Sequence, residues 1–198
     1  MVVFGITGGS GSGKTSVSKM LEKLGVHIID TDVIAHEIVE PNSDCLNELV
    51  DYFGDSILND DKTLNRKKLA SIAFSDKQKT EALSNITHKY IKAEVVKDIN
   101  TTDAELVGID GAVIIGSNVE PLCEFIVSVI ADKQSRITRI KTRDKITDEQ
   151  AIQRINAQND DEFYKENSMY IIYNNGDIAQ LESDVVGLFN KIKGNSFE

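Results

Sequence analysis

Five short apolar runs along the chain are rich in β-branched side chains and show no regular alternation with polar residues. They span residues 2–6, 26–29, 106–109, 125–130 and 170–173. Runs of this kind are typical of strands that are buried on both faces of a parallel sheet. Because segments with helical periodicity separate them, the pattern predicts a doubly wound, three-layer α/β/α fold around a five-stranded parallel sheet.

Helical periodicity is clearest after the first run and near the end of the chain. Val17 and Leu21 belong to an apolar stripe with helical spacing that directly follows the first run. Thr147, with Gln150 three residues later, has the signature of a capping box and predicts the start of a later helix. Residues 180–192 are predicted to form a closing amphipathic helix.

The segment 42–100 differs from the rest of the chain. It contains three or four helical patterns, one of them ending at Gly54, and no convincing strand. An all-helical insertion of this size is larger than a crossover between two strands requires. We interpret it as a cap that holds an acceptor substrate, and additional packing helices are the alternative.

Composition restricts the possible partners. The chain has 198 residues and a formal net charge of −10. A surface that acidic disfavours binding to nucleic acid or to an anionic membrane, so an anionic substrate needs a local cluster of positive groups.

Cys45 and Cys123 are far apart in sequence and lack metal-like spacing to His, as expected of free thiols in a reducing compartment. With no visible signal peptide or membrane span, we expect a cytoplasmic protein.

The most informative motif is Gly-Gly-Ser-Gly-Ser-Gly-Lys-Thr at residues 8–15, which fits the pattern G-x-x-x-x-G-K-[ST] of a phosphate-binding loop. It follows a predicted strand and opens a predicted helix, as phosphate binding requires. Its glycines allow backbone N–H groups to turn inward around a phosphate, and the helix N-terminus adds partial positive charge. The expected nucleotide-binding residues are Gly8, Gly11, Ser12, Gly13, Lys14, Thr15 and Ser16.

This loop predicts a P-loop NTPase fold that binds ATP together with Mg²⁺. Lys14 is expected to pair with the β- and γ-phosphates, and the Thr15 hydroxyl is expected to bind the metal. We therefore expect a phosphotransferase that moves the γ-phosphoryl group in line, under a lid that excludes water.

Carboxylates follow two of the predicted strands. Asp30 and Asp32 come after the second strand, at the edge where an open α/β sheet binds its ligand. In an extended segment they would point the same way, so that one accepts a proton and the other orients a water on Mg²⁺. Alternatively, Asp32 caps a helix over residues 33–39. Asp110 ends the third strand, a place for an acid that holds Mg²⁺ through water, but also common in turns.

Basic residues are concentrated in one segment. From Asp132 to Lys145 there are six basic and two acidic residues, a local charge of +4 in an acidic chain. Arg139 and Arg143 are four residues apart and would share one face of a helix. Guanidinium groups on a mobile lid can close over a transferring phosphate. We therefore expect at least one catalytic arginine here, and a solvated basic helix is the alternative.

These elements predict a single P-loop kinase domain. Its core is expected to comprise residues 1–41, 101–131 and 159–198. The helical, acceptor-binding insertion is expected at about 42–100, and the segment at about 132–158, which we call the lid, is expected to close over the nucleotide.

Several stretches, in the same order along nearly the whole chain, resemble the dephospho-CoA kinase family. The phosphate loop is shared by many kinases, whereas the paired Asp segment and the lid with its trailing Arg and Gln are more specific. The stretches are Gly5-Ile6-Thr7 with the phosphate loop, Asp30-Thr31-Asp32-Val33-Ile34-Ala35-His36, Asn65-Arg66 leading to Ala73-Phe74, Ile86-Thr87-His88, Arg139 with Arg143, Ala151 to Arg154 with Gln158, and Ile172-Tyr173-Asn174-Asn175-Gly176.

The resemblance implies transfer of the γ-phosphoryl group of ATP to the ribose 3′-hydroxyl of dephospho-CoA, the last step of coenzyme A biosynthesis. It implies that Asp32 is the general base and that the helical insertion binds the acceptor, with His36 and His88 among its binding residues. Lys14 would match the loop lysine of the family, and the two arginines would match its lid arginines. The expected metal-binding residues are Thr15, Asp30 and Asp110.

The chain departs from the family pattern at three places. It has His36 where the family usually has Arg, and Lys89 where the family has Pro. Its residues 112–116 stand where the family has a Pro-Leu-Leu-Phe-Glu run.

A kinase for another small acceptor, such as a nucleoside monophosphate, is the alternative activity. A nucleotide-gated switch is disfavoured because no Asn-Lys-x-Asp guanine signature follows a strand. The intact Lys14 and Asp32 argue against a non-catalytic ATP-binding protein.

Overall fold

A computed structural model describes residues 1–195 of the chain. The described chain divides into two compact units. Within the described residues, 1–29 and 102–195 form the first unit, which contains the sheet, and 30–101 form the second, which is helical. Residues 30–41, expected to belong to the core, therefore group with the helical unit.

The sheet contains the five strands that the apolar runs predict, each within one residue of the expected ends. They are β1 (Val2–Thr7), β2 (His27–Asp30), β3 (Leu106–Asp110), β4 (Phe125–Ile130) and β5 (Tyr170–Tyr173). Their order is β2-β3-β1-β4-β5, and β1 pairs in parallel with β3 and β4. Every residue of β3 is buried, which explains why its sequence shows no alternation between polar and apolar positions.

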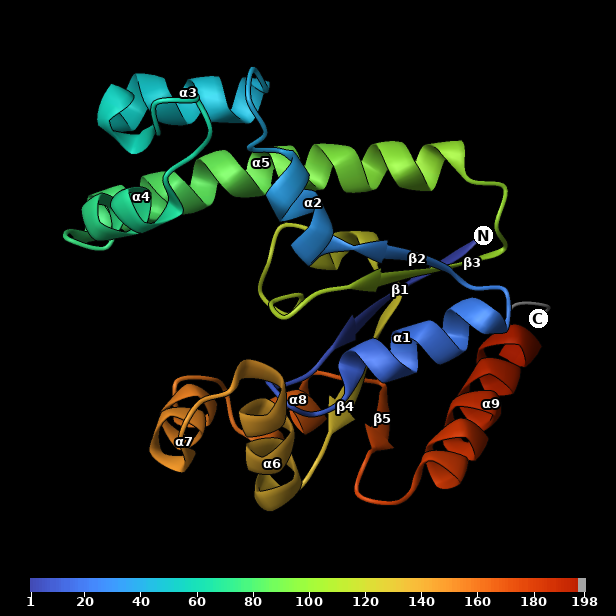
Figure 1. The fold of residues 1–198 in the computed structure, drawn as a ribbon. Coiled ribbons are helices and arrows are strands. Elements are labelled where there is room, and N and C mark those ends of the chain that lie inside the picture. Colours follow the sequence, from blue (N-terminus) through green and yellow to red (C-terminus); the bar gives the residue numbers. More distant parts are fainter. Residues whose placement is uncertain (196–198) are drawn as a thin grey trace. The chain divides into compact units, whose positions relative to one another are not determined.

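Two helices of the sheet unit lie side by side, one against the central strands and the other against the edge strand β5 (Figure 1). They are α1 (Lys14–Lys23) and α9 (Ile178–Asn195). Val17 and Leu21 from α1 and Val185 from α9 share one buried apolar cluster with residues of β1 and β4. This core anchors the first residues of α1, and therefore the phosphate loop, at the carboxyl end of β1.

Three helices follow β4 and form the lid and its connection to β5. They are α6 (Lys133–Asp144), α7 (Asp148–Asn156) and α8 (Asp161–Glu166). Ile137 and Ile140 of α6 pack against Ala151 and Ile155 of α7 in a small buried cluster. The predicted capping box at Thr147 is confirmed at the start of α7. The six-residue helix α8 was not expected from the sequence.

The helical unit is built around one long helix, with shorter helices along it (Figure 1). Its helices are α2 (Thr31–Glu37), α3 (Asp44–Phe53), α4 (Arg66–Ala73) and α5 (Lys77–Thr101), and short 3-10 turns occur at Asp55–Ile57 here and at Glu120–Leu122 in the sheet unit. Helix α3 ends before Gly54, as its sequence predicts. The patterns expected after α4 belong to one continuous helix, α5, of 25 residues.

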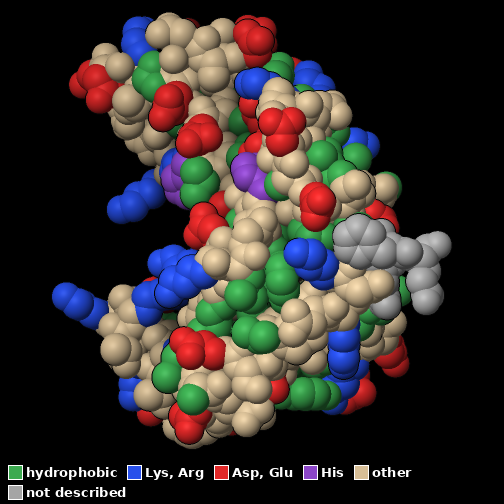
Figure 2. Space-filling view, turned by 90° about the vertical axis from the view of Figure 1, so that its right-hand side faces the viewer, with side chains coloured by type: hydrophobic (Ala, Val, Ile, Leu, Met, Phe, Trp, Pro, Cys, Tyr) green, Lys and Arg blue, Asp and Glu red, His purple; other side chains and the backbone are tan. Residues whose placement is uncertain are grey.

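The acidic character of the sequence is visible on the surface. Figure 2 shows acidic side chains at many places on the face that it draws, together with Lys and Arg side chains. Within the described part of the chain, no helix is both long enough and apolar enough to cross a membrane.

Candidate active site

The phosphate loop, residues 8–15, connects β1 to α1 and adopts a conformation that depends on glycine. Gly11 and Gly13 have φ values of 77° and 97°, in the left-handed region that other residues rarely adopt. A Cβ atom at Gly13 would lie 2.0 Å from Nδ2 of Asn174, and one at Gly11 would lie 2.7 Å from the carbonyl oxygen of Arg136. The loop is therefore packed closely from outside, and neither glycine can be replaced without displacing a neighbour.

One hydroxyl inside this loop is buried without a hydrogen-bond partner among the described residues. It is Oγ of Ser12, a residue that is 1% exposed. A buried polar group without a partner is costly, and a phosphate oxygen would supply the acceptor that this hydroxyl needs. The loop therefore fits an anionic phosphate ligand in both its backbone conformation and its side-chain chemistry.

The lysine of the loop is held by the acid at the end of β3. The ammonium group of Lys14 forms an ion pair with the carboxylate of Asp110, which is 3% exposed. Ser18, one turn further along α1, donates its hydroxyl hydrogen to Oδ2 of Asp110 at 2.7 Å. The structure thus brings together two predicted site residues, the loop cation and the expected metal-binding acid, and sequence analysis did not expect their direct pairing.

Arg139, one of the two expected lid arginines, binds the outside of the phosphate loop. Its guanidinium group donates hydrogen bonds to the carbonyl oxygens of Gly11 and Ser12, both at 3.2 Å. It also donates to the carbonyl oxygen of Asn174 at 3.0 Å. Asn174, directly after β5, in turn donates from Nδ2 to the carbonyl oxygen of Ser12 at 2.8 Å. Arg139 therefore stabilises the loop and the end of β5 together.

Arg143, the second expected lid arginine, is on the surface, with a side chain that is 61% exposed. Its Nε and one terminal nitrogen donate to the two carboxylate oxygens of Asp144, at 2.7 and 3.0 Å. Arg154 also pairs with Asp144. Hydrogen bonding from Arg143, followed by its positive charge, lowers the pKa of the Asp144 carboxyl below its ordinary value. The guanidinium group of Arg143 is thus held in an exposed acid–base cluster.

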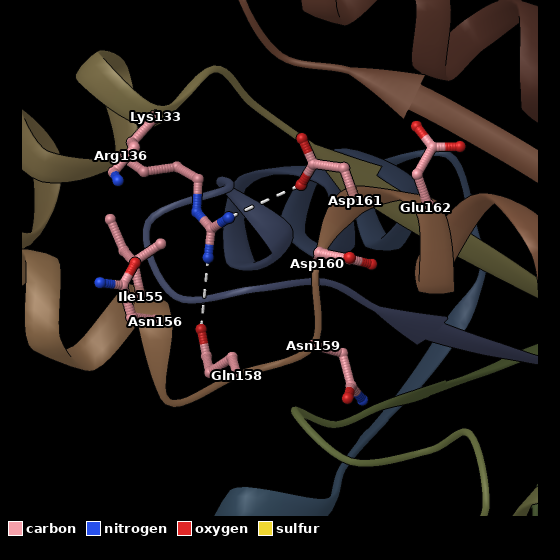
Figure 3. Close-up of a pocket in the computed structure, with 9 residues that line it drawn as sticks. All are labelled: Lys133, Arg136, Ile155, Asn156, Gln158, Asn159, Asp160, Asp161 and Glu162. Atoms are coloured by element: carbon pink, nitrogen blue, oxygen red, sulfur yellow. Dashed lines mark hydrogen bonds and ion pairs between the residues drawn. The ribbon is translucent and has the colours of Figure 1, made fainter.

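Arg136, to which sequence analysis gave no role, is the arginine that is buried. Figure 3 shows its guanidinium group between the side chains of Gln158 and Asp161. Its Nε donates to the carbonyl oxygen of Ser10 at 2.9 Å. Gln158, from the segment after α7, accepts a hydrogen bond from the backbone N–H of Ser10 at 2.7 Å. The position of Arg136 in the basic segment was the only signal for it in the sequence.

Asp30, the last residue of β2, and Asp32, in the first turn of α2, differ from the sequence expectation. Helix α2 begins at Thr31, so the segment is helical at Asp32 and not extended, and the expected helix start at residue 33 is wrong. The N-cap of α2 is Asp30, whose Oδ1 accepts from the N–H groups of Asp32 at 2.8 Å and Val33 at 3.1 Å. Asp32 is therefore not the cap of this helix. Its carboxylate is exposed in the first helical turn.

The two histidines expected to bind the acceptor both lie in the helical unit and are exposed. Nδ1 of His36 lies 2.7 Å from the carbonyl oxygen of Asp32, one turn earlier in α2. His88 lies in α5, next to Lys89, which pairs with Glu48 of α3. Tyr90 donates to the same Glu48 carboxylate at 2.7 Å, so this network ties α3 to α5 beside His88.

Ligands for a metal are sparse. In residues 1–195, no group of three or more His, Cys, Asp or Glu is placed to hold a metal ion. Thr15 is exposed on the first turn of α1, and Asp110 is buried beside Lys14. The residues present therefore fit a metal that arrives with oxygen ligands from a nucleotide, as Mg²⁺ does with triphosphates.

Comparison with known sequences identifies relatives over nearly the whole chain. The sequence matches the family model described as dephospho-CoA kinase over residues 2–180. A dephospho-CoA kinase from Lactobacillus johnsonii is 34% identical over 191 residues, which cover 95% of this chain and 96% of the relative.

Solved structures also resemble the chain over nearly its whole length. A dephospho-CoA kinase from Campylobacter jejuni has a TM-score of 0.70 at 27% identity, and the match covers 98% of each chain. A protein from Thermus thermophilus has a TM-score of 0.83 at 24% identity, over 96% of this chain and 97% of that one. The predicted three-layer α/β/α fold of a P-loop kinase is thereby confirmed.

Proposed function

The chain belongs to the dephospho-CoA kinase family, and from this membership and the geometry of its site we propose how its residues perform the reaction. The enzyme is an ATP-dependent kinase that phosphorylates the 3′-hydroxyl of dephospho-CoA to give coenzyme A and ADP. The proposal rests on one observation above all. The phosphate loop contains a buried Ser12 hydroxyl that has no hydrogen-bond partner among the described residues, and Lys14 stands near the end of the same loop.

ATP binds with its phosphates against the amides of the loop residues Gly11, Ser12, Gly13 and Lys14, and Ser16 lies in the first turn of the helix behind them. Lys14 exchanges its partner when the nucleotide arrives, leaving Asp110 for the β- and γ-phosphates. The exchange keeps an anion beside Lys14, but it leaves the buried carboxylate of Asp110 in need of a new positive partner. The Ser12 hydroxyl gains the acceptor that it lacks among the described residues.

We further propose that Mg²⁺ binds together with ATP, held by the Thr15 hydroxyl and, through water, by Asp110. When bound, the metal would neutralise charge on the phosphate oxygens. Asp110 becomes available for this role when Lys14 leaves it. Oδ1 of Asp30 caps α2, so Asp30 would contact the metal through its other carboxylate oxygen, Oδ2.

The attacking group is the 3′-hydroxyl of the acceptor, and Asp32 accepts its proton as the new oxygen–phosphorus bond forms and the bond to the β-phosphate oxygen breaks. An exposed carboxylate in a first helical turn is available for such a task. His36 and His88, from α2 and α5, bind the acceptor. The proton moves from the hydroxyl to Asp32, and the leaving electron pair stays on ADP.

The lid arginines have different tasks in this proposal. Arg143 is exposed, and it would have to leave Asp144 to contact a transferring phosphate. Arg139 holds three carbonyl oxygens around the loop, so it would have to give up these bonds to contact the phosphate directly. We therefore assign transition-state stabilisation to Arg143 and support of the loop to Arg139.

The cytoplasmic location expected from the sequence stays a prediction.

The experiment that tests the activity measures ADP release from Mg-ATP with different acceptors. Dephospho-CoA is compared with AMP, CMP, shikimate and water at equal concentrations. The proposal predicts release that depends on dephospho-CoA and is near background with the others. Strong stimulation by AMP or CMP alone would establish the alternative of a nucleoside monophosphate kinase, and release without any acceptor would indicate an NTPase.

A further inference from the structure

A buried arginine outside the predicted catalytic set holds the phosphate loop from behind. The side chain of Arg136 is 7% exposed, although an arginine is seldom buried without a partner. Its Nε donates to the carbonyl oxygen of Ser10, and one terminal nitrogen donates to Oε1 of Gln158 at 3.3 Å. The same Oε1 atom accepts from the N–H group of Ser10 at 2.7 Å. Both backbone groups of Ser10 are thus bound by side chains of the lid.

The ion pair of Arg136 does not explain its burial. Its carboxylate partner, Asp161, is 3.6 Å away and has a side chain that is 42% exposed, so the pair is long and partly solvated. Figure 3 shows the guanidinium group reaching from α6 to a position between Gln158 and Asp161. The short bond of Arg136 is the one to the loop carbonyl. Its burial is therefore compensated mainly by contact with the loop.

The packing around Ser10 supports the same conclusion. A Cβ atom at Gly9 would lie 2.3 Å from a terminal nitrogen of Arg136. A Cβ atom at Gly11 would lie 2.7 Å from the carbonyl oxygen of the same arginine. The residues on both sides of Ser10 are therefore glycines that pack directly on Arg136.

A loop with so many glycines loses much conformational freedom when it becomes ordered around a ligand. A contact that orders the loop before the ligand arrives lowers the cost of binding. Ser10 lies between Gly9 and Gly11, so fixing its peptide groups restricts a glycine-rich part of the loop. Arg136 also places a positive charge beside a loop that binds an anion, in a chain of net charge −10.

We propose that Arg136 is a positioning residue for the reaction: together with Gln158 it holds both backbone groups of Ser10 and keeps the phosphate loop in its nucleotide-binding conformation. We call this pair of side chains the Ser10 clamp. Because Arg136 belongs to α6 and Gln158 follows α7, the clamp also joins two segments of the lid to the loop. The inference rests on the proposed binding of ATP at residues 8–15 and adds residues that do not touch the substrates.

The test compares the parent enzyme with Arg136→Met, Arg136→Lys and the control Arg154→Met. Arg154 is in the same lid but pairs with Asp144 on the surface. Calorimetry with ADP and ATP gives the dissociation constants, and steady-state kinetics give the KM for each substrate and kcat. Hydrogen exchange of a peptide covering residues 8–13 reports the order of the loop without nucleotide.

Arg136→Met is expected to raise the dissociation constants of ADP and ATP, and the KM for ATP, by roughly ten- to a hundredfold, the effect of losing hydrogen bonds to a charged group. The KM for dephospho-CoA at saturating ATP should stay within about threefold, since Ser10 and both clamp residues belong to the sheet unit. Loop exchange should accelerate without nucleotide and slow again with saturating ADP. Arg136→Lys, which keeps the charge but not the geometry of the guanidinium group, should recover only part of the affinity.

Nucleotide affinity within twofold of the parent in a folded Arg136→Met variant would overturn the proposal. Full recovery by Arg136→Lys would also overturn it, because charge alone would then account for the effect. If Arg136→Met does not fold, Gln158→Leu decides, with a severalfold loss of nucleotide affinity expected and unchanged affinity contradicting the clamp. Binding of ADP needs no acceptor, so these results are independent of whether dephospho-CoA proves to be the substrate.

Discussion

The ammonium group of Lys14 is paired with the carboxylate of Asp110, so the cation at the end of the phosphate loop is held in place by the acid that ends β3. Ser18 fixes the other oxygen of the same carboxylate from the next turn of α1. The site therefore contains a buried ion pair that ATP has to replace. Breaking such a pair by removing one partner leaves an uncompensated charge, which is costly.

Replacement of Asp110 by Asn is expected to destabilise the nucleotide-free enzyme more than the nucleotide-bound one. Without nucleotide, Lys14 would lose its anionic partner, whereas bound ADP or ATP would supply phosphate oxygens in its place. Thermal unfolding with and without saturating ADP measures the difference. An equal loss of Tm in both states would show that Lys14 stays on Asp110 when nucleotide binds, and Ser18→Ala serves as a control that leaves the ion pair intact.

Asp32→Ala is expected to reduce turnover by several orders of magnitude while nucleotide binding stays close to that of the parent. The reason is that the proposed base acts on the acceptor hydroxyl and not on ATP. Rapid-quench measurement of CoA formation, together with ADP calorimetry, separates the two effects. Turnover near the parent level would show that Asp32 is not the base.

Asp30→Ala is expected to lower stability by about 1 kcal/mol, the usual value of an N-cap. The basis is the pair of hydrogen bonds from Asp32 and Val33 that its carboxylate accepts. Urea unfolding followed by circular dichroism provides the measurement, and Asp30→Asn, which can still cap the helix, is the matched control. Equal stability of the Ala variant and the parent would contradict the capping role.

The two lid arginines should respond differently to replacement by Met. Arg143→Met is expected to lower kcat by about 10³-fold, the lower end of the range for an arginine that stabilises a transferring phosphate, with little change in Tm. Arg139→Met removes hydrogen bonds from the loop and from Asn174, so it should weaken ATP binding and lower Tm. Measuring kcat, KM and Tm for both variants is sufficient. The reverse pattern would exchange the two assignments.

The Glu48 network of the helical unit predicts a dependence of stability on pH. Hydrogen bonds from Lys89 and then from Tyr90 lower the pKa of the Glu48 carboxyl below its ordinary value of 4.5. A lowered pKa in the folded state stabilises the fold fully above the ordinary value, and the benefit disappears as pH falls through the folded value. Tyr90→Phe should therefore be less stable than the parent near neutral pH and should approach it in acid. Urea midpoints that differ equally at pH 7 and at pH 3 would contradict this expectation.

Local sequence patterns predict most of this fold for physical reasons that are visible in the structure. The runs that became the central strands β3, β1 and β4 are apolar at nearly every position because most of their residues are buried. The phosphate loop is recognisable from its own residues. Its glycines are required because few other residues can adopt φ values near 77° or 97°. The capping box at Thr147 depends only on residues three apart, and it was therefore readable from the sequence.

The long-range contacts of the site could not be predicted from the sequence. Arg136 and Ser10 are separated by 126 positions, and nothing local distinguishes this arginine from Arg139 or Arg143. The pairing of Lys14 with Asp110 likewise joins residues 96 positions apart. The misplaced start of α2 has a different cause, because two acids in one short segment both suit an N-cap and only the backbone geometry selects Asp30.

The most direct test of the central claim follows the phosphoryl group itself. The enzyme is incubated with Mg²⁺, dephospho-CoA and ATP labelled at the γ-phosphate, and the products are separated and located by label. The account predicts that the label appears in the 3′-phosphate of coenzyme A, at a rate that falls by several orders of magnitude in Lys14→Ala. Label found in inorganic phosphate or in another acceptor, or undiminished transfer by the Lys14 variant, would contradict it.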